Sequence, residues 1–153
     1  GFETFDDSIR DAYKIADTRG INYKFIPTNL GEDYHPNTVK VVFNYKDDTS
    51  EYVIGSSIGG GNIIIVEING IKVNFDGRFP TFLFQYPEQT GVIAEVSTVL
   101  AEEDYNIESI NTAKDELKNI VTLTVELDEK ASESVKNKLL DNSRYIESKY
   151  VEV

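Results

Sequence analysis

The sequence predicts an α+β protein whose first half is mostly sheet and whose second half alternates strands with helices. Two observations carry this prediction. In the second half, apolar residues recur with helical spacing over Val92–Leu100 and Val135–Leu140, and apolar runs of strand length flank both stretches. In the first half, short apolar runs are separated by turn signals such as Asn69-Gly70, which is typical of a two-residue hairpin.

The second half reads as strand, helix, strand, strand, helix, strand. We expect a buried strand over Pro80–Tyr86, a helix from Val92, strands from Asn106-Ile107 and over Ile120–Leu127, a helix starting near Ala131 or Ser132, and a last strand over Tyr145–Val153. A repeated split βαβ unit of this kind gives an antiparallel sheet with two helices on one face, the ferredoxin-like arrangement. This domain is predicted to span residues 79–153.

The first half is predicted to be a partial, mostly-sheet domain over residues 1–78. Asp6 or Asp7 caps a helix that Gly20 ends. The expected strands are Tyr23–Ile26, Thr38–Tyr45, Tyr52–Ile54, Ile63–Val66 and a returning strand through Val73 and Phe75. The domain boundary is expected near Asp76–Phe79.

Charge and composition exclude several classes of protein. The 27 acidic and 15 basic residues give a formal charge of -12, which repels a phosphate backbone and an anionic membrane surface. The chain has no cysteine, so it cannot hold an iron–sulfur cluster through thiolates. With a single histidine, any metal site would have to be built from carboxylates and one imidazole. No apolar run approaches the roughly 20 residues of a membrane span, and we expect a cytoplasmic protein.

Two stretches of the first half could carry chemistry. His35 and Asn37 lie in a His-Pro-Asn-Thr segment, and an imidazole can give or take a proton near neutral pH. The run Gly55–Asn62 is dense in glycine and serine and could let a small carboxylate approach the backbone. It lacks the Gly-Lys-Ser/Thr of a nucleotide-binding loop, and a bulged loop built on glycines with positive φ is the favoured alternative.

A third stretch lies where the first strand of the second half meets its helix. Glycine at position 91 ends the turn Pro87–Thr90, so the first N–H groups of the helix point at this turn. Those donors and the helix dipole favour a carboxylate, and an amino acid is a natural ligand. A simple connecting loop that needs a glycine explains the same residues equally well.

Residues 80–153 resemble the ACT domain, a ligand-sensing module often regulated by amino acids. The loop that carries the resemblance is Glu88-Gln89-Thr90-Gly91-Val92-Ile93, with Thr90 where proline is common, and Asn106-Ile107 matches the family's entry into its second strand. The resemblance implies a regulatory ligand site. Its residues would be Glu88, Gln89, Thr90, Gly91, Val92 and Asn106.

The first half narrows the resemblance to iron–sulfur L-serine dehydratases. The segment His35-Pro36-Asn37-Thr38 followed by Gly55–Asn62 is similar to the beta region of that family, which joins an allosteric substrate-binding domain to an ACT domain. The family's beta chains begin further upstream, so the chain is expected to be truncated at its N-terminus. The resemblance implies that His35 and Asn37 face a shared catalytic cleft. Substrate contacts are expected from Ser57, Gly59, Gly60, Gly61 and Asn62.

The resemblance also implies partners and a cofactor. A separate alpha subunit would hold a [4Fe-4S] cluster, L-serine or another small amino acid would bind, and the ACT domain would form a homodimer. The isolated chain is expected to be inactive. Two alternatives stay open: a stand-alone amino-acid-sensing ACT protein, and the regulatory region of a D-3-phosphoglycerate dehydrogenase. Neither alternative requires the His35 and glycine motifs.

Overall fold

The computed structural model describes residues 6–152 and divides the chain into two compact units, 1–31 and 32–153. The first unit contains the short 3-10 helix η1 (Asp7–Asp11) and the helix α1 (Ala12–Thr18). Asp6 caps η1, since its carboxylate accepts a hydrogen bond from the Ser8 N–H at 2.8 Å. The predicted helix is confirmed, and Gly20 follows its end with φ of 68°.

The predicted strand Tyr23–Ile26 is wrong. The segment has no regular secondary structure, and no strand of the described residues pairs with it. Its aromatic side chains instead contact α1: the rings of Tyr23 and Tyr13 stack at 5.3 Å, and Phe25 meets Tyr13 edge-on at 5.9 Å. An alternating apolar run therefore forms no strand here, because no strand among residues 6–152 lies beside it to share backbone hydrogen bonds.

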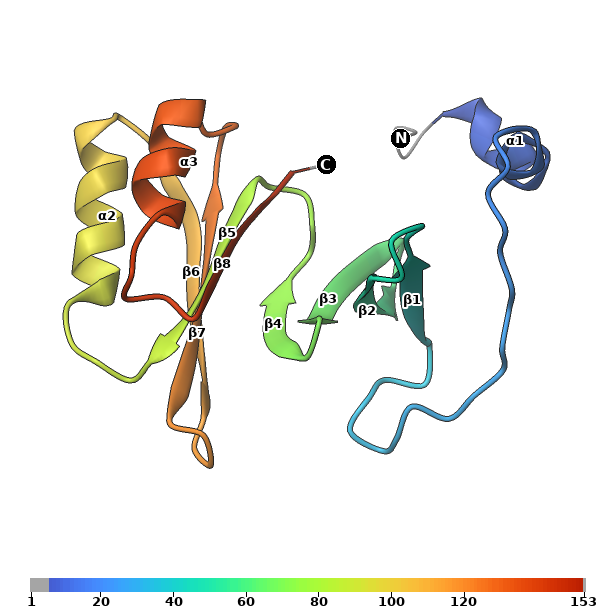
Figure 1. Cartoon of the computed structure of the whole chain (residues 1–153), viewed down its shortest axis with the longest axis horizontal. Helices are drawn as coiled ribbons and strands as arrows, with labels where there is room; N and C mark the ends of the chain where they lie inside the picture. The colour runs from blue at the N-terminus through green and yellow to red at the C-terminus, as the bar shows by residue number, and fades with distance from the viewer. Residues whose placement is uncertain (1–5, 153) are drawn as a thin grey trace. The chain divides into compact units, whose positions relative to one another are not determined.

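The second unit begins with a four-stranded antiparallel sheet in the order β1-β2-β3-β4 (Figure 1). Its strands are β1 (Thr38–Asn44), β2 (Ser50–Gly59), β3 (Asn62–Ile68) and β4 (Ile71–Phe75). β2 is longer than predicted, because Gly55–Gly59 continue the strand, with one register shift between Ile54 and Gly55 and a second between Ser57 and Gly59. Gly60 and Gly61 then form the turn with φ of 63° and 81°, which is the backbone of a tight hairpin.

The rest of the second unit has the ferredoxin-like arrangement that the sequence predicts. It consists of β5 (Thr81–Pro87), α2 (Val92–Glu102), β6 (Ile107–Asp115), β7 (Ile120–Leu127), α3 (Glu133–Leu140) and β8 (Glu147–Val151). The strand order is β6-β7-β5-β8, and every neighbouring pair is antiparallel. Both helices lie on one face of this sheet (Figure 1). The predicted end of the last strand, Val153, lies outside the described residues.

The core of this domain forms between the sheet and the two helices. Phe82 and Phe84 of β5 are fully buried and pack with Val96 of α2 and Val135 of α3. Alternation along β5 places these rings on the helix side, so the aromatic run forms core, as expected. Burying a side chain of this size is worth roughly 1.5–3 kcal/mol.

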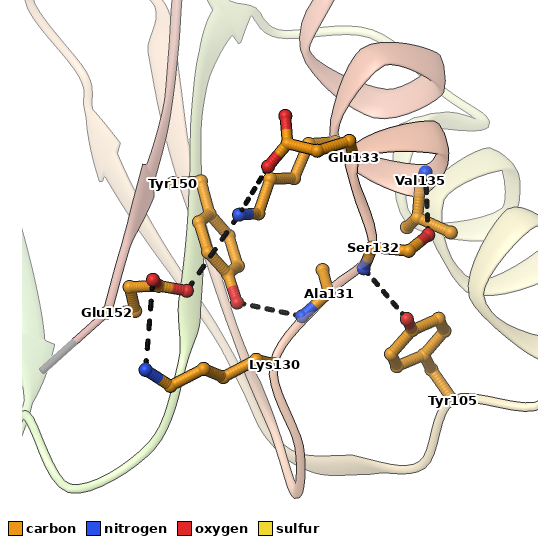
Figure 2. A network of polar contacts seen from close by, with 9 residues as sticks. Tyr105, Lys130, Ala131, Ser132, Glu133, Val135, Tyr150 and Glu152 are labelled. Atoms are coloured by element: carbon orange, nitrogen blue, oxygen red, sulfur yellow. Dashed lines mark hydrogen bonds and ion pairs between the residues drawn. The ribbon is translucent and has the colours of Figure 1, made fainter.

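Two tyrosines fix the start of α3 (Figure 2). The Tyr150 hydroxyl accepts from the Ala131 N–H at 2.8 Å, and the Tyr105 hydroxyl accepts from the Ser132 N–H at 2.8 Å. Ser132 caps the helix by accepting from the Val135 N–H at 3.3 Å. The predicted helix start is therefore confirmed, and the N–H groups of the two residues before the helix both have partners.

The helix-free face of this sheet packs on β4 within the second unit. Leu83 of β5 is buried with Ile71, Val73 and Phe75 of β4, and Val151 packs against this cluster. The predicted boundary between residues 78 and 79 falls in the connection between β4 and β5, and it stays a prediction. None of the helices among residues 6–152 is long and apolar enough to span a membrane.

Candidate functional site

A cavity of about 340 Å³ lies beside His35 on one face of the first sheet. Its polar lining comes from the segment before β1 and from strands β2 and β4, while Ile58, Ile64 and Val66 form an apolar wall. The polar residues lining it are Asp33, Tyr34, His35, Ser56, Lys72 and Asn74. An imidazole, a hydroxyl and an ammonium group thus surround one space, the kind of set that holds a small polar substrate.

The His35 segment is fixed by short hydrogen bonds to β1 and β2. The Thr38 hydroxyl donates to the His35 carbonyl at 2.5 Å, and it lies 2.7 Å from the buried Ser56 hydroxyl. The Ser57 N–H donates to the Asn37 carbonyl at 2.8 Å. The exposed His35 ring is oriented by the Asn37 N–H, which donates to Nδ1 at 3.1 Å. Because Nδ1 accepts, Nε2 carries the proton of the neutral ring and is available to a ligand.

Glu67 is the centre of a polar network beside the cavity. It is 8% exposed, and its carboxylate accepts hydrogen bonds from the Tyr52 hydroxyl at 2.6 Å and the Tyr34 hydroxyl at 2.9 Å. Lys72 pairs with the same carboxylate at 3.1 Å. Burial raises the pKa of Glu67, but the hydrogen bonds from Tyr52, Tyr34 and Lys72 outweigh burial, so its pKa lies below the ordinary value.

The network places a cation at the cavity. The Lys72 ammonium lies 4.8 Å from the Tyr34 ring centre and 3.2 Å from its hydroxyl oxygen. Its pKa is raised, chiefly by the hydrogen bond to Tyr34, although burial opposes this. Lys72 therefore stays charged at neutral pH and can attract a carboxylate to the cavity.

The structure brings together only part of the predicted catalytic and substrate-binding set. His35 lines the cavity, and Asn37 supports it through its backbone N–H and carbonyl. Ser57 pairs with Ile63 on the other face of β2, because successive side chains of a strand alternate. The residues at the hairpin end are Gly59, Gly60, Gly61 and Asn62, which are exposed and do not line the cavity. Their assignment as substrate contacts stays a prediction.

The predicted regulatory loop is braced by Arg144, a residue that the sequence did not indicate. Its guanidinium donates to the Thr90 carbonyl at 2.8 Å and to the Gln89 side chain at 3.1 Å, and it pairs with Glu95 in the first turn of α2. Gly91 has φ of 90°, which a residue with a Cβ adopts only under strain. A ligand carboxylate at this helix start would thus meet both the Arg144 cation and the Glu95 anion.

The remaining predicted regulatory residues are distributed around this loop. Glu88 pairs with Lys114 at 2.9 Å, and the Val92 side chain is buried in the core. Asn106 is exposed, and its carbonyl accepts from the Asp128 N–H at 3.4 Å. Within residues 6–152, its side chain makes no hydrogen bond with the loop residues. Their role as a ligand site stays a prediction.

Ser56, Tyr34 and Lys72 line the His35 cavity but were not predicted from the sequence, which indicates them only weakly. Ser56 lies inside the glycine-rich run, one position before the predicted Ser57, and a shift of one residue moves a strand side chain to the other face. Tyr34 and Lys72 lie 38 positions apart, and only the pairing of β3 with β4 brings Glu67 opposite Lys72. No group of three or more potential metal ligands forms among residues 6–152.

Comparison with known proteins places the chain in a family. Residues 81–143 match the ACT domain model. The "L-serine dehydratase, beta chain" of Peptoniphilus asaccharolyticus is 54% identical over 153 residues, which are all of this chain and 69% of that protein. The "Probable L-serine dehydratase, beta chain" of Bacillus subtilis (strain 168) is 32% identical over 139 residues, 90% of this chain and 62% of that protein.

These matches confirm the predicted resemblance and do not favour the two alternatives, a stand-alone ACT sensor and a D-3-phosphoglycerate dehydrogenase region. The ACT match covers the ferredoxin-like half up to residue 143, while the first relative aligns with both halves, including the His35 segment and the glycine-rich run. From this whole-chain similarity we conclude that the chain belongs to the family of L-serine dehydratase beta chains.

Proposed function

We propose that this chain is the beta subunit of an enzyme that converts L-serine to pyruvate and ammonia. The observation that carries the proposal is the 54% identity over the whole chain to an L-serine dehydratase beta chain. The His35 cavity supports it, because it offers an imidazole and a cation to a small zwitterionic substrate. A separate alpha subunit would complete the enzyme, because a beta chain is one of two different subunits.

The reaction is an elimination followed by hydrolysis. A base removes the α-proton of serine while the β-hydroxyl leaves as water after protonation, which gives aminoacrylate. Its imine tautomer takes up water and releases ammonia and pyruvate. The chain has no cysteine, so a [4Fe-4S] cluster would have to be held by the alpha subunit. When bound there, the cluster would supply a Lewis acid for the leaving hydroxyl.

The residues of this chain contribute binding and proton transfer in this scheme. Lys72 attracts the serine carboxylate, and the buried Ser56 hydroxyl orients a polar group of the substrate at the cavity wall. The Nε2 atom of His35 gives or takes a proton at the substrate, since the Asn37 N–H occupies Nδ1. A beta subunit that docks with this cavity toward the cluster would shield the reacting atoms from water.

Anaerobic co-expression with the candidate alpha subunit tests the proposal. We expect a brown complex after pull-down of this chain, with pyruvate formed from L-serine, and activity lost when either subunit is omitted. A chain that stays alone and colourless, with activity unaffected by its absence, would refute the proposal.

Substitution of His35 tests the site assignment within the same complex. His35→Ala should lower kcat by about 10²-fold or more if the ring transfers a proton. The control is Thr98→Ala on the exposed side of α2, which should leave kcat unchanged. A His35→Ala complex with unchanged turnover and an unchanged pH profile would remove His35 from the reaction.

Regulation belongs to the same proposal. The ACT half would bind a small amino acid at the loop Glu88–Val92 and at Asn106, and it would pair with a second copy of the chain. Sedimentation with and without L-serine measures this pairing.

The complete enzyme is expected in the cytoplasm, where a fractionation experiment would find it.

A further inference from the structure

A second cavity, of about 480 Å³, lies within the second unit between the helix-free face of the β5–β8 sheet and the turn that joins β3 to β4. Its floor is one row of side chains across all four strands: Ala113, Thr122, Gln85 and Glu147. The Asn69-Gly70 turn and Lys72 form the opposite wall. The volume is in the range of small-molecule sites.

Three lysines surround this cavity in a chain that has only 15 basic residues and a charge of -12. Lys114 lies 2.9 Å from Glu88 and 3.0 Å from Glu116, and hydrogen bonds to these two carboxylates raise its pKa. Lys118 lies 3.6 Å from Asp115, a contact too long for a hydrogen bond. The cavity therefore presents three ammonium groups that each lie within 4 Å of a carboxylate, and Lys118 has the longest of these contacts.

The floor also carries polar groups without a protein partner. Within residues 6–152, neither the half-buried Gln85 amide nor the Thr122 hydroxyl makes a side-chain hydrogen bond. Thr122 is only 6% exposed and lines the cavity. No side-chain polar atom among residues 6–152 is both fully buried and unpaired, so these two groups are open to water or to a ligand in the cavity.

The geometry points to a binding site for an α-amino acid in this cavity. The lysines receive the carboxylate, Glu147 and Asp115 receive the ammonium group, and Gln85 and Thr122 hydrogen-bond to the ligand. Among residues 6–152, no arginine and no aromatic ring lines the cavity, which argues against a nucleotide. The site shares no residue with the loop Glu88–Val92.

The site is placed to influence the His35 cavity. Lys72 lines both cavities, and its ammonium group pairs with the Glu67 carboxylate at 3.1 Å. A ligand carboxylate that binds Lys72 therefore competes with that ion pair. Binding in the second cavity therefore changes the charge that the first cavity presents. This consequence rests on the proposed function, whereas the binding itself does not.

Calorimetry on the chain as it stands tests the inference, with each proteinogenic amino acid titrated in turn. We expect saturable binding of at least one, and affinity lowered about tenfold or more when its amine is acetylated or its carboxylate is amidated, because each change removes a charged hydrogen bond. Lys118→Ala and Thr122→Val should each weaken binding about threefold to tenfold. The matched control is Lys130→Ala, whose side chain is 63% exposed against 72% for Lys118, and whose ion pair to Glu152 is similarly long at 3.8 Å.

Three results would overturn the inference. The first is the absence of saturable binding by any amino acid. The second is binding that Lys118→Ala and Thr122→Val leave intact while Asn106→Ala abolishes it, which would place the ligand at the α2 loop. The third is an equal loss from Lys130→Ala, which would indicate general charge attraction. Dehydratase activity of the complex is measured separately, so failure of one proposal leaves the other standing.

Discussion

Replacing Glu67 by glutamine is the sharpest test of the network beside the His35 cavity. The carboxylate is 8% exposed and accepts two tyrosine hydroxyls, at 2.6 Å from Tyr52 and 2.9 Å from Tyr34. A hydrogen bond to a charged group contributes about 1.5–3 kcal/mol, against about 0.5–1.5 kcal/mol for a neutral one. Each tyrosine contact should thus lose about 1 kcal/mol, while the exposed Lys72 partner adds little.

We therefore expect Glu67→Gln to lower the free energy of unfolding by about 2 kcal/mol. With an m value of about 2 kcal/mol/M, the urea midpoint followed by circular dichroism should fall by about 1 M. The matched control is Glu51→Gln. Glu51 also accepts a tyrosine hydroxyl, from Tyr45 at 2.9 Å, but its side chain is 49% exposed, so its replacement should change the midpoint much less.

The same substitution has a pH signature. The folded-state pKa of Glu67 lies below its ordinary value of 4.5, so its contribution to stability is fully present above about pH 4.5. That contribution is lost as the pH falls through the lowered folded-state pKa. Glu67→Gln should flatten this acid limb of the stability profile. A variant that unfolds at the urea midpoint of Glu51→Gln, or that keeps the wild-type acid limb, would refute the role given to the carboxylate.

Two further predictions concern the ferredoxin-like half. Phe82→Ala should destabilise the chain by about 3–5 kcal/mol in urea denaturation, because the ring is fully buried and its centre lies 4.7 Å from that of Tyr150. The control is Phe25→Ala, which should cost little because Phe25 is 73% exposed. Equal effects of the two substitutions would contradict the assigned core. Ser132→Ala should lower the free energy of unfolding by about 1 kcal/mol, because the hydroxyl that caps α3 is lost. The control is Ser134→Ala, an exposed position in the same helix. A loss no greater than that of the control would disprove the cap.

The regular half of the fold is predictable because its local signals agree with one another. The helix-spaced residues Val92, Val96 and Leu100 are all buried on the same side of the sheet. The Asn69-Gly70 dipeptide forms the predicted hairpin turn, since both residues adopt positive φ. Tyr23–Ile26 has an equally good strand pattern and forms none. Strand formation needs a partner backbone, and a local pattern does not reveal whether one exists.

The sequence by itself determined the ferredoxin-like order of elements, the absence of cysteine ligands and the family resemblance, because each of these depends on residue type and local spacing. Tertiary structure alone decided which polar groups meet. Ser56 rather than Ser57 faces the His35 cavity, since strand side chains alternate and the face is set by pairing with β3. Arg144 reaches the Thr90 carbonyl across 54 positions of chain, a contact that only the packing of the last connection against α2 creates.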